Sequence, residues 1–153
     1  MARAPRAISS DIEIDAPRSV VWSILRELDA YPEWNPFTIA VTSTLELGAS
    51  VEMQVKLRPP KVMRQVEYVS AYVEGEKVCW GANVGPGWFI RADRCQVLTD
   101  LGGNRTRYFT TDVFHGVGVG LMFAVVGRHV QRGFDDVARA LKARAEAEAA
   151  GSS

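Results

Sequence analysis

The spacing of apolar residues changes twice along this chain of 153 residues, and no other feature constrains the fold as much. Across residues 38–115 apolar side chains alternate with polar ones, as at Val51, Met53 and Val55. A period of two is that of β-strands with one buried face. After Gly116 the apolar residues recur every three or four positions over about 30 residues, which predicts one long helix.

Turn-forming residues divide the alternating region into about six strands. No helices alternate with these strands, so the pattern favours an antiparallel meander over a doubly wound parallel sheet. The turns fall at Gly48 and at residues 58–60, 75–76, 85–87 and 102–104.

The region before the meander combines a strand, a helix and a proline-containing segment. Alternation over residues 8–15 predicts a first strand, and the apolar face of residues 17–28 predicts a helix that packs on the sheet. Residues 31–37 hold two prolines, which exclude a long regular element, and three aromatic side chains, which favour burial. We expect a short, partly helical lid here, and an α+β fold of about seven strands overall.

Length and charge bound the classes of function. A chain of 153 residues suits one domain, which we place at residues 7–146, with flexible termini at 1–6 and 147–153. Lys and Arg total 18, as do Asp and Glu, and no basic stripe carries interleaved aromatics, so no nucleic-acid partner is expected. The sequence contains no apolar run of about 18 residues, so no membrane span is predicted, and no secretion signal is recognisable.

The sequence offers no cofactor site. Cys79 and Cys95 are too few for a disulfide framework and lack metal-ligand spacing, so we expect reduced thiols in a cytoplasmic protein. Two histidines exclude a three-histidine metal site. Residues 116–120 read G-x-G-x-G between a strand and a helix, but no second parallel strand follows to complete a dinucleotide site.

Several local sequences resemble the START and Bet v 1-like (SRPBCC) superfamily. Residues 12–22 (IEIDAPRSVVW) and 31–37 (YPEWNPF) look like its opening, and residues 78–81 (VCWG) and 112–116 (DVFHG) look like later landmarks. The nearest grouping looks like the polyketide cyclase/dehydrase and lipid-transport branch. The resemblance implies a helix-grip fold, in which a curved antiparallel sheet wraps on a long C-terminal helix around a hydrophobic cavity. It implies no single reaction, because the superfamily includes carriers, receptors, cyclases and dehydratases.

Apolar residues of the lid, the strands and the last helix are candidates for lining such a cavity, although they could equally form a solid core. Glycines in the last helix leave room on its inner side and so favour a cavity, or else they serve close contact between helix and sheet. The candidate ligand-binding residues are Trp34, Phe37, Met53, Val55, Trp80, Phe89, Thr110, Phe114, Phe123, Val126, Gly127 and Val130.

Four polar residues are candidates for catalysis: Arg91, Asp93, Tyr108 and Asp112. If Phe89 points inward, Arg91 and Asp93 share its face, and if the phenylalanine at 114 points inward, Asp112 and Tyr108 share that one. A carboxylate desolvated beside an arginine suits acid and base chemistry. The alternative is a self-satisfied ion pair, or a register shifted by one residue that leaves these side chains in water.

The resemblance is imperfect at two of these positions. Asp93 stands where related sequences often carry a histidine, so proton chemistry carried over from that histidine does not transfer. Asp112 stands where a glutamate is common, and its carboxylate has less reach.

Two functions from different classes follow. The first is an enzyme that folds a polyketide-like or other apolar intermediate and assists its cyclisation or dehydration by positioning and proton transfer, without metal or redox cofactor. The second is a non-catalytic carrier or sensor of a lipid-like ligand, in which the same polar residues anchor an end group. A third, weaker hypothesis is an accessory protein that docks on a partner. The sequence predicts no oligomeric state.

Overall fold

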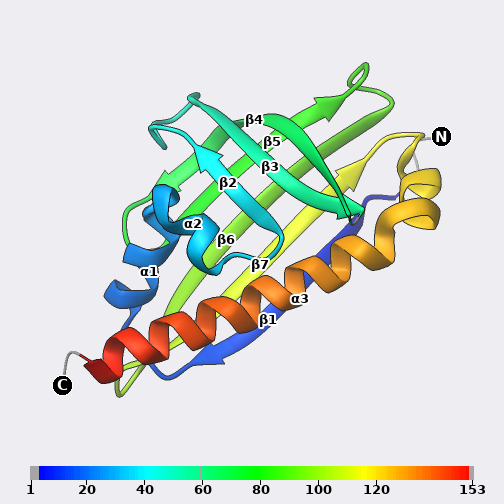
Figure 1. Cartoon of the computed structure of the whole chain (residues 1–153). Helices are drawn as coiled ribbons and strands as arrows, with labels where there is room; N and C mark the ends of the chain where they lie inside the picture. Colours follow the sequence, from blue (N-terminus) through cyan, green and yellow to red (C-terminus); the bar gives the residue numbers. More distant parts are fainter. Residues whose placement is uncertain (1–3, 59, 152–153) are drawn as a thin grey trace.

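The computed structural model describes residues 4–58 and 60–151. A strand, three short helices, six strands and a long helix follow one another along the chain (Figure 1). The strands are β1 (Arg6–Ile14), β2 (Thr38–Thr42), β3 (Ser50–Arg58), β4 (Lys61–Val73), β5 (Lys77–Val84), β6 (Ile90–Gly102) and β7 (Arg105–His115). The helices are α1 (Arg18–Arg26), the 3-10 turn η1 (Leu28–Ala30), α2 (Tyr31–Trp34) and α3 (Val119–Gly151).

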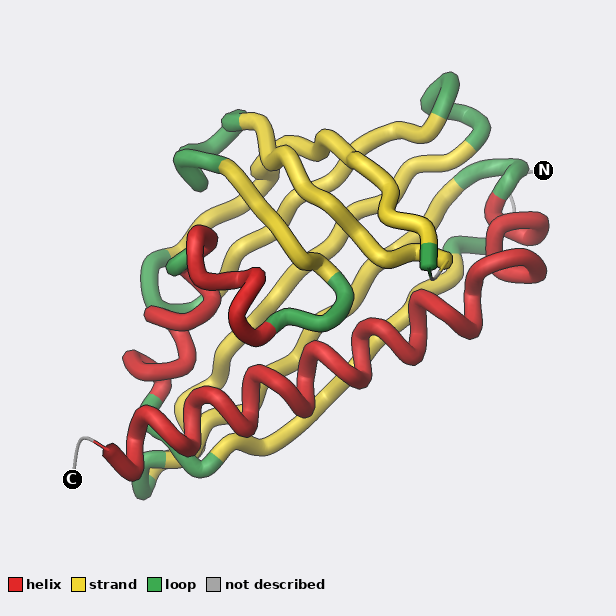
Figure 2. The backbone as a smooth tube through the Cα atoms, viewed as in Figure 1, coloured by secondary structure: helices red, strands yellow, loops and turns green. Residues whose placement is uncertain are grey.

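The seven strands form one antiparallel sheet in the order β1-β7-β6-β5-β4-β3-β2. The sheet is strongly curved, and α3 crosses its concave side, with α1 and α2 beside it (Figures 1 and 2). This arrangement is the helix-grip fold, so the predicted fold class is confirmed. The predicted meander is also present, because each strand from β2 to β7 pairs with the next along the chain.

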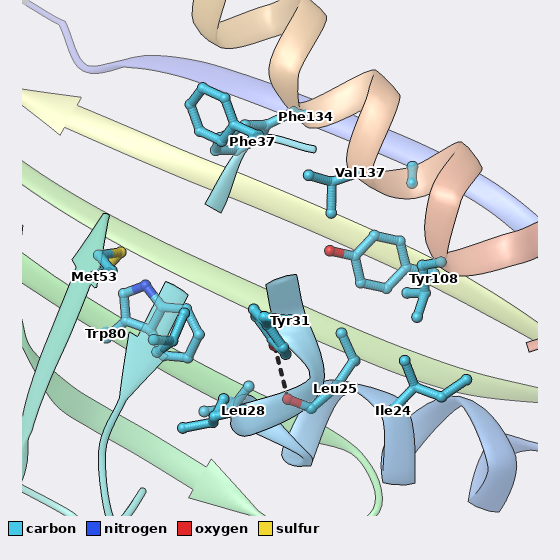
Figure 3. Packing of buried hydrophobic residues seen from close by; sticks show 14 of the residues in the cluster. Ile24, Leu25, Leu28, Tyr31, Phe37, Met53, Trp80, Tyr108, Phe134 and Val137 are labelled. Carbon is cyan, nitrogen blue, oxygen red and sulfur yellow. Dashed lines mark hydrogen bonds between the residues drawn. The ribbon is translucent and has the colours of Figure 1, made fainter. Parts of the chain in front are cut away.

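Helix α3 packs through a stripe of apolar residues at helical spacing. Val130, Phe134, Val137 and Leu141 are all buried on its inner face. Phe134 meets Phe37 of the lid edge to face, with ring centroids 6.0 Å apart. This contact ties the segment between α2 and β2 to the middle of the long helix (Figure 3).

Gly133 is needed for that contact. A Cβ atom at this position would lie 2.2 Å from Cδ2 of Phe37, which is closer than two carbon atoms can approach. The interpretation that the helical glycines leave empty space is therefore wrong at Gly133, where an aromatic ring already occupies the room. Gly133 instead allows close packing of the helix, although its partner is Phe37 of the lid and not the sheet.

Hydrogen bonds explain why the lid is short. The Tyr31 hydroxyl donates to the Leu25 carbonyl at 2.7 Å and holds α2 against α1 (Figure 3). The Asn35 side-chain oxygen accepts from the backbone N–H groups of Phe37 at 3.0 Å and Thr38 at 2.8 Å. An asparagine that satisfies two downstream amides in this way ends the helix and turns the chain into β2.

The end of α3 differs from the prediction. Residues 147–151 continue the helix beyond the predicted domain end at 146, and β1 begins at Arg6, one residue before the predicted start. The physical reason is that Ala145 is fully buried and that Lys142 bonds both Glu146 at 2.6 Å and the Glu13 carbonyl at 2.8 Å. These contacts hold the last turns on the sheet.

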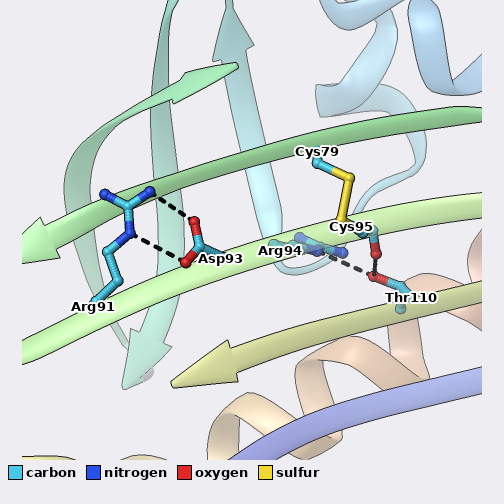
Figure 4. The surroundings of a disulfide bond; sticks show 6 residues. All are labelled: Cys79, Arg91, Asp93, Arg94, Cys95 and Thr110. Carbon is cyan, nitrogen blue, oxygen red and sulfur yellow. Dashed lines mark hydrogen bonds and ion pairs between the residues drawn. A yellow bond between two sulfur atoms is a disulfide. The ribbon is translucent and has the colours of Figure 1, made fainter. Parts of the chain in front are cut away.

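The prediction for the cysteines is wrong as well. Cys79 and Cys95 form a disulfide between β5 and β6, with their Cα atoms 4.1 Å apart (Figure 4). The two residues lie directly opposite each other in the strand register, a relation that their spacing in the sequence does not reveal. Disulfides persist mainly in oxidising compartments, so the cysteines no longer argue for a cytoplasmic protein.

The glycine contact yields a matched pair of substitutions. Gly133→Ala should lower the free energy of unfolding by about 1–3 kcal/mol, because overpacking against Phe37 exceeds the gain in helix propensity. Gly127→Ala should be neutral or stabilising, because its Cβ would lie at an ordinary 3.4 Å from Phe123. Urea denaturation of both variants measures the free energy of unfolding. Equal stability of the two would contradict the contact.

The disulfide yields a second expectation. The bond joins residues 16 positions apart, and closing a loop of this length should stabilise the fold by about 3 kcal/mol. Reductant should therefore lower the thermal midpoint of the wild-type protein. The Cys79→Ala, Cys95→Ala double variant should start from the lower midpoint and show no response to reductant. A wild-type midpoint that ignores reductant would contradict a stabilising bond.

Candidate functional site

A cavity of about 490 Å³ lies between the concave face of the sheet and α3. Its apolar walls come from both layers of the fold. The lining includes Phe37, Met53, Val55, Phe114, Val126 and Val130. The volume falls within the range of pockets that enclose drug-sized molecules, about 300–1,000 Å³.

Four ionisable side chains line this cavity. Arg64 is exposed at the edge and pairs with Glu52, whereas Glu67 of β4, Arg94 of β6 and Asp112 of β7 lie deeper. Arg94 and Asp112 are direct partners in the register of β6 and β7, so they lie side by side on the concave face. Glu67 pairs with Val51, which is buried on the same face, and so reaches the cavity from the other side of β5. The cavity is apolar with one charged patch on its floor.

Arg94 is held in place from two sides. Its Nε donates to the Thr110 hydroxyl at 3.2 Å (Figure 4). Its guanidinium carbon lies 4.3 Å from the ring centroid of Phe134. Thr110 in turn donates to the Cys95 carbonyl at 3.1 Å. Only 7 % of Arg94 is exposed, yet the described residues form no ion pair with it. The guanidinium therefore keeps donors available for a ligand in the cavity.

Burial shifts the pKa of both cavity carboxyl groups upward. Burial raises the pKa of Asp112 from 3.8 to about 7, and the opposing pull of Arg94 only partly offsets this. Burial raises the pKa of Glu67 from 4.5 to about 7, and the negative charge of Asp112 adds to the effect. The Asp112 Oδ1 atom is enclosed and has no hydrogen-bond partner among the described residues. At neutral pH the pair can hold a proton and also accept one.

Two of the candidate catalytic residues lie on the wrong face. Along β6 the buried residues are Ile90, Arg94, Gln96 and Leu98, so the even-numbered side chains face inward. Arg91 and Asp93 therefore point away from the cavity and pair with each other, from Arg91 Nη2 to Asp93 Oδ1 at 2.7 Å (Figure 4). The inner face of β6 is therefore shifted by one residue from the predicted one, and a shift of one residue exchanges the two faces of a strand.

The other two candidates lie on the inner face of β7. Asp112 is at the cavity wall. Tyr108 is fully buried beneath it and donates its hydroxyl hydrogen to Gln96 Oε1 at 2.6 Å. Burial raises the pKa of the Tyr108 hydroxyl. Tyr108 therefore belongs to the packed core and to the network around Arg94, whereas Asp112 can touch a ligand.

The candidate ligand-binding residues divide between the cavity and the core. Those outside the cavity lining are Trp34, Trp80, Phe89, Thr110, Phe123 and Gly127. Trp34 packs edge to face on Tyr31 with ring centroids 5.1 Å apart, and Trp80 is 2 % exposed in the core. Phe89 packs beneath the turn that precedes α3, where its carbonyl would clash with any Cβ at Gly116.

Sequence reasoning missed Glu67 and Arg94. The sequence does contain a signal for Arg94. The aliphatic residues Ile90 and Leu98 mark the inner face of β6, and Arg94 lies on the same face. Phe89, from which the inner face was predicted, precedes the strand. No comparable signal marks Glu67. Val66 and Tyr68 make the opposite face of β4 look like the buried one, yet these side chains are 41 % and 55 % exposed. Only the pairing of β4 with β3 turns Glu67 inward.

Comparison with known families gives one match over most of the chain. The model of the family "Polyketide cyclase / dehydrase and lipid transport" matches residues 5–146. The chain belongs to this family. A comparison with curated protein sequences gives no match. Membership supports a cavity that binds a hydrophobic ligand, and it leaves the chemistry of the family member open.

Solved structures share the family fold at low sequence identity. The di-domain ARO/CYC protein StfQ of the steffimycin pathway matches with a TM-score of 0.74 at 12% identity, over 95% of this chain and 52% of that one. A START superfamily protein of Mycobacterium smegmatis matches at 0.69 and 18%, over 93% and 98%. Norcoclaurine synthase of Thalictrum flavum, in complex with dopamine and hydroxybenzaldehyde, matches at 0.68 and 11%, over 92% and 86%. These likenesses show the fold.

The raised pKa values predict how stability depends on pH. A carboxyl group whose pKa is higher in the folded state stabilises the fold while it is protonated, and this contribution is lost as pH rises toward the folded-state value. For Asp112 and Glu67 this window runs from about 4 to about 7. Asp112→Asn should flatten the decline of the thermal midpoint across this window. Asp93→Asn, on the outer face, removes only a secondary cause of the raised pKa values and should change the slope much less. Equal slopes in all three proteins would contradict the assignment.

Proposed function

We propose that this member of the polyketide cyclase/dehydrase and lipid-transport family binds a bulky, largely apolar molecule that carries carbonyl groups, and that it assists cyclisation or dehydration of this molecule. The observation that carries the proposal is a buried arginine between two carboxyl groups of raised pKa, all on the wall of one apolar cavity. A carrier needs one anchoring group, whereas acid and base chemistry needs at least two groups near one centre.

Arg94 is the group that would bind a carbonyl oxygen. Its guanidinium is oriented by Thr110 and Phe134 before any ligand arrives. A fixed cation in a site shielded from water stabilises negative charge that develops on an oxygen, and it does so without reorganisation. The oxygen of an enolate carries such a negative charge.

Asp112 and Glu67 would move the proton. The ionised carboxylate removes a proton from the carbon next to the carbonyl, and the electron pair of that C–H bond forms the enolate. The enolate carbon then attacks a second carbonyl of the same molecule, and the new alkoxide takes a proton from the neutral carboxyl group. In the dehydration, a carboxylate removes a second proton from the carbon next to the first carbonyl, and the electron pair of that C–H bond forms a C=C double bond. The hydroxyl group leaves with a proton from the other, neutral carboxyl group as water. Two carboxyl groups with pKa values near 7 suit both directions of transfer.

Hydrogen exchange on a simple ketone tests this proposal without knowledge of the natural substrate. In D₂O the wild-type protein should accelerate deuterium incorporation next to the carbonyl of 2-tetralone, followed by NMR. The Glu67→Gln, Asp112→Asn double variant should lose about 100-fold of this rate or more. Arg94→Gln should lose rate even at saturating ketone.

Asp93→Asn provides the matched control, because this carboxylate is partly buried and paired with an arginine but lies outside the cavity. It should retain most of the exchange rate, because its charge is only a secondary cause of the raised pKa values of the two cavity carboxyl groups. If 2-tetralone binds and the wild-type protein gives no acceleration over buffer, proton transfer is excluded and the chain is a carrier or sensor. Native mass spectrometry of protein purified from its natural host would then identify the retained ligand.

A further inference from the structure

The cavity opens at the end of the sheet where β3 meets β4, where β5 meets β6, and where α3 begins. Val84 and Gly85 of the β5–β6 turn and Met122 of α3 line the cavity at this end. Backbone hydrogen bonds join the two neighbouring turns, from Val117 N–H to the Trp88 carbonyl at 3.2 Å and from Gly118 N–H to the Phe89 carbonyl at 2.9 Å. The mouth therefore has a firm edge on this side.

Large, exposed apolar side chains lie on the turns and on the helix that border this mouth. We call them the apolar rim: Val84, Trp88, Val117, Leu121 and Val125, which are 56%, 68%, 63%, 67% and 53% exposed. Leu121 and Val125 lie on the outer side of α3, while their neighbours Met122 and Val126 face the cavity. An exposed apolar cluster of this kind marks an interaction site.

Basic residues without carboxylate partners accompany the rim. Arg6 begins β1, with its guanidinium carbon 4.0 Å from the ring centroid of Phe123, and Lys61 begins β4. Arg128 and Arg132 continue the outer stripe of α3 at helical spacing from Leu121 and Val125, and all four cations are exposed. Among the described residues none of them forms an ion pair.

Basic side chains in the rest of the molecule differ from these four in how they are paired. Most basic side chains away from the mouth are matched by an acidic partner, so their charge is locally neutralised. The pairs are Arg18–Glu76, Arg26–Glu74, Arg105–Glu13, Arg107–Asp11, Arg139–Asp136, Lys142–Glu146 and Arg144–Glu33. In a chain with equal numbers of basic and acidic residues, four cations without an ion pair thus accompany the exposed apolar residues, although Lys56 and Lys77 also lack an ion pair among the described residues.

We propose that the cavity mouth docks on an anionic membrane surface. The rim would enter the boundary between headgroups and acyl chains, and Arg6, Lys61, Arg128 and Arg132 would lie among the lipid phosphates. Trp88 suits this depth because its ring is apolar and its N–H is polar. No helix of the described residues is long and apolar enough to span a bilayer, so the binding would be peripheral.

A membrane fits this surface better than an acidic protein does. The rim residues stand on the tips of two turns and on the first turns of a helix, so together they form a projecting edge. A projecting apolar edge flanked by long basic side chains can sink into a fluid interface, whereas a protein partner would need a matching groove. Docking here would also let an apolar ligand pass between bilayer and cavity without crossing water.

Vesicle binding tests the proposal on the full chain. The protein should co-sediment with vesicles of phosphatidylcholine and phosphatidylserine, and much less with phosphatidylcholine alone. Trp88 is the most exposed of the four tryptophans, so its emission should shift to the blue on binding, and Trp88→Phe should abolish the shift while retaining binding. Arg128→Gln and Arg132→Gln should each lower the partition coefficient about fivefold.

Matched controls separate the mouth from the rest of the surface. Leu121→Asp should lower partitioning at least about tenfold, whereas Leu47→Asp, at an equally exposed leucine in the turn before β3, should bind as the wild type does. Arg139→Gln, on the later half of α3, should have little effect. Leu121→Asp should also retain the 2-tetralone exchange rate, so failure of docking and failure of the proposed chemistry are distinguishable.

Three outcomes would overturn the proposal. The first is no binding to anionic vesicles, and the second is binding that Leu121→Asp and Leu47→Asp weaken equally. The third is a wild-type dimer in sedimentation velocity that Leu121→Asp dissociates, which would assign the rim to a second copy of the chain. Capture of an acidic carrier protein by the rim, without vesicle binding, would equally exclude the membrane.

Discussion

The contact between Phe37 and α3 is the constraint on which the cavity depends. A curved sheet of seven strands is wider than one helix, whose diameter with side chains is about 10–12 Å, so a single helix cannot fill the concave side. Phe37 reaches across from the lid and packs on Phe134, and Gly133 leaves the space it needs. The edge that carries β2 is thereby tied to the helix, and the unfilled space becomes a pocket that opens at one end.

The ionisable side chains determine the chemical properties of that pocket. A cation buried among apolar walls is costly unless it is compensated, and desolvation makes the two cavity carboxyl groups harder to ionise. Thr110 and Phe134 hold the guanidinium without neutralising it. An oxygen with developing negative charge would supply the missing compensation. The buried arginine and the raised pKa values therefore both suit the proposed chemistry.

The surface follows a complementary pattern. Ion pairs cover the end of the molecule away from the mouth, while the mouth carries unpaired cations and exposed aliphatic side chains. Leu121 and Met122 are consecutive residues of α3, one facing out and one lining the cavity. The same helical turn therefore belongs both to the ligand site and to the proposed membrane contact, which couples where the protein docks to where its ligand enters.

By itself, the sequence determined the fold class, the number of strands and the place of the long helix, because hydrophobic periods and turn residues are local properties that repeat along each element. It also indicated several residues of the cavity wall, such as Met53 and Val126. Only the tertiary structure decided which polar side chains meet. Strand pairing turned Arg94 inward and Asp93 outward, brought Glu67 from a distant strand, and joined Cys79 to Cys95. A shift of one residue reverses every side chain of a strand, so register, a relation between strands, governs the site.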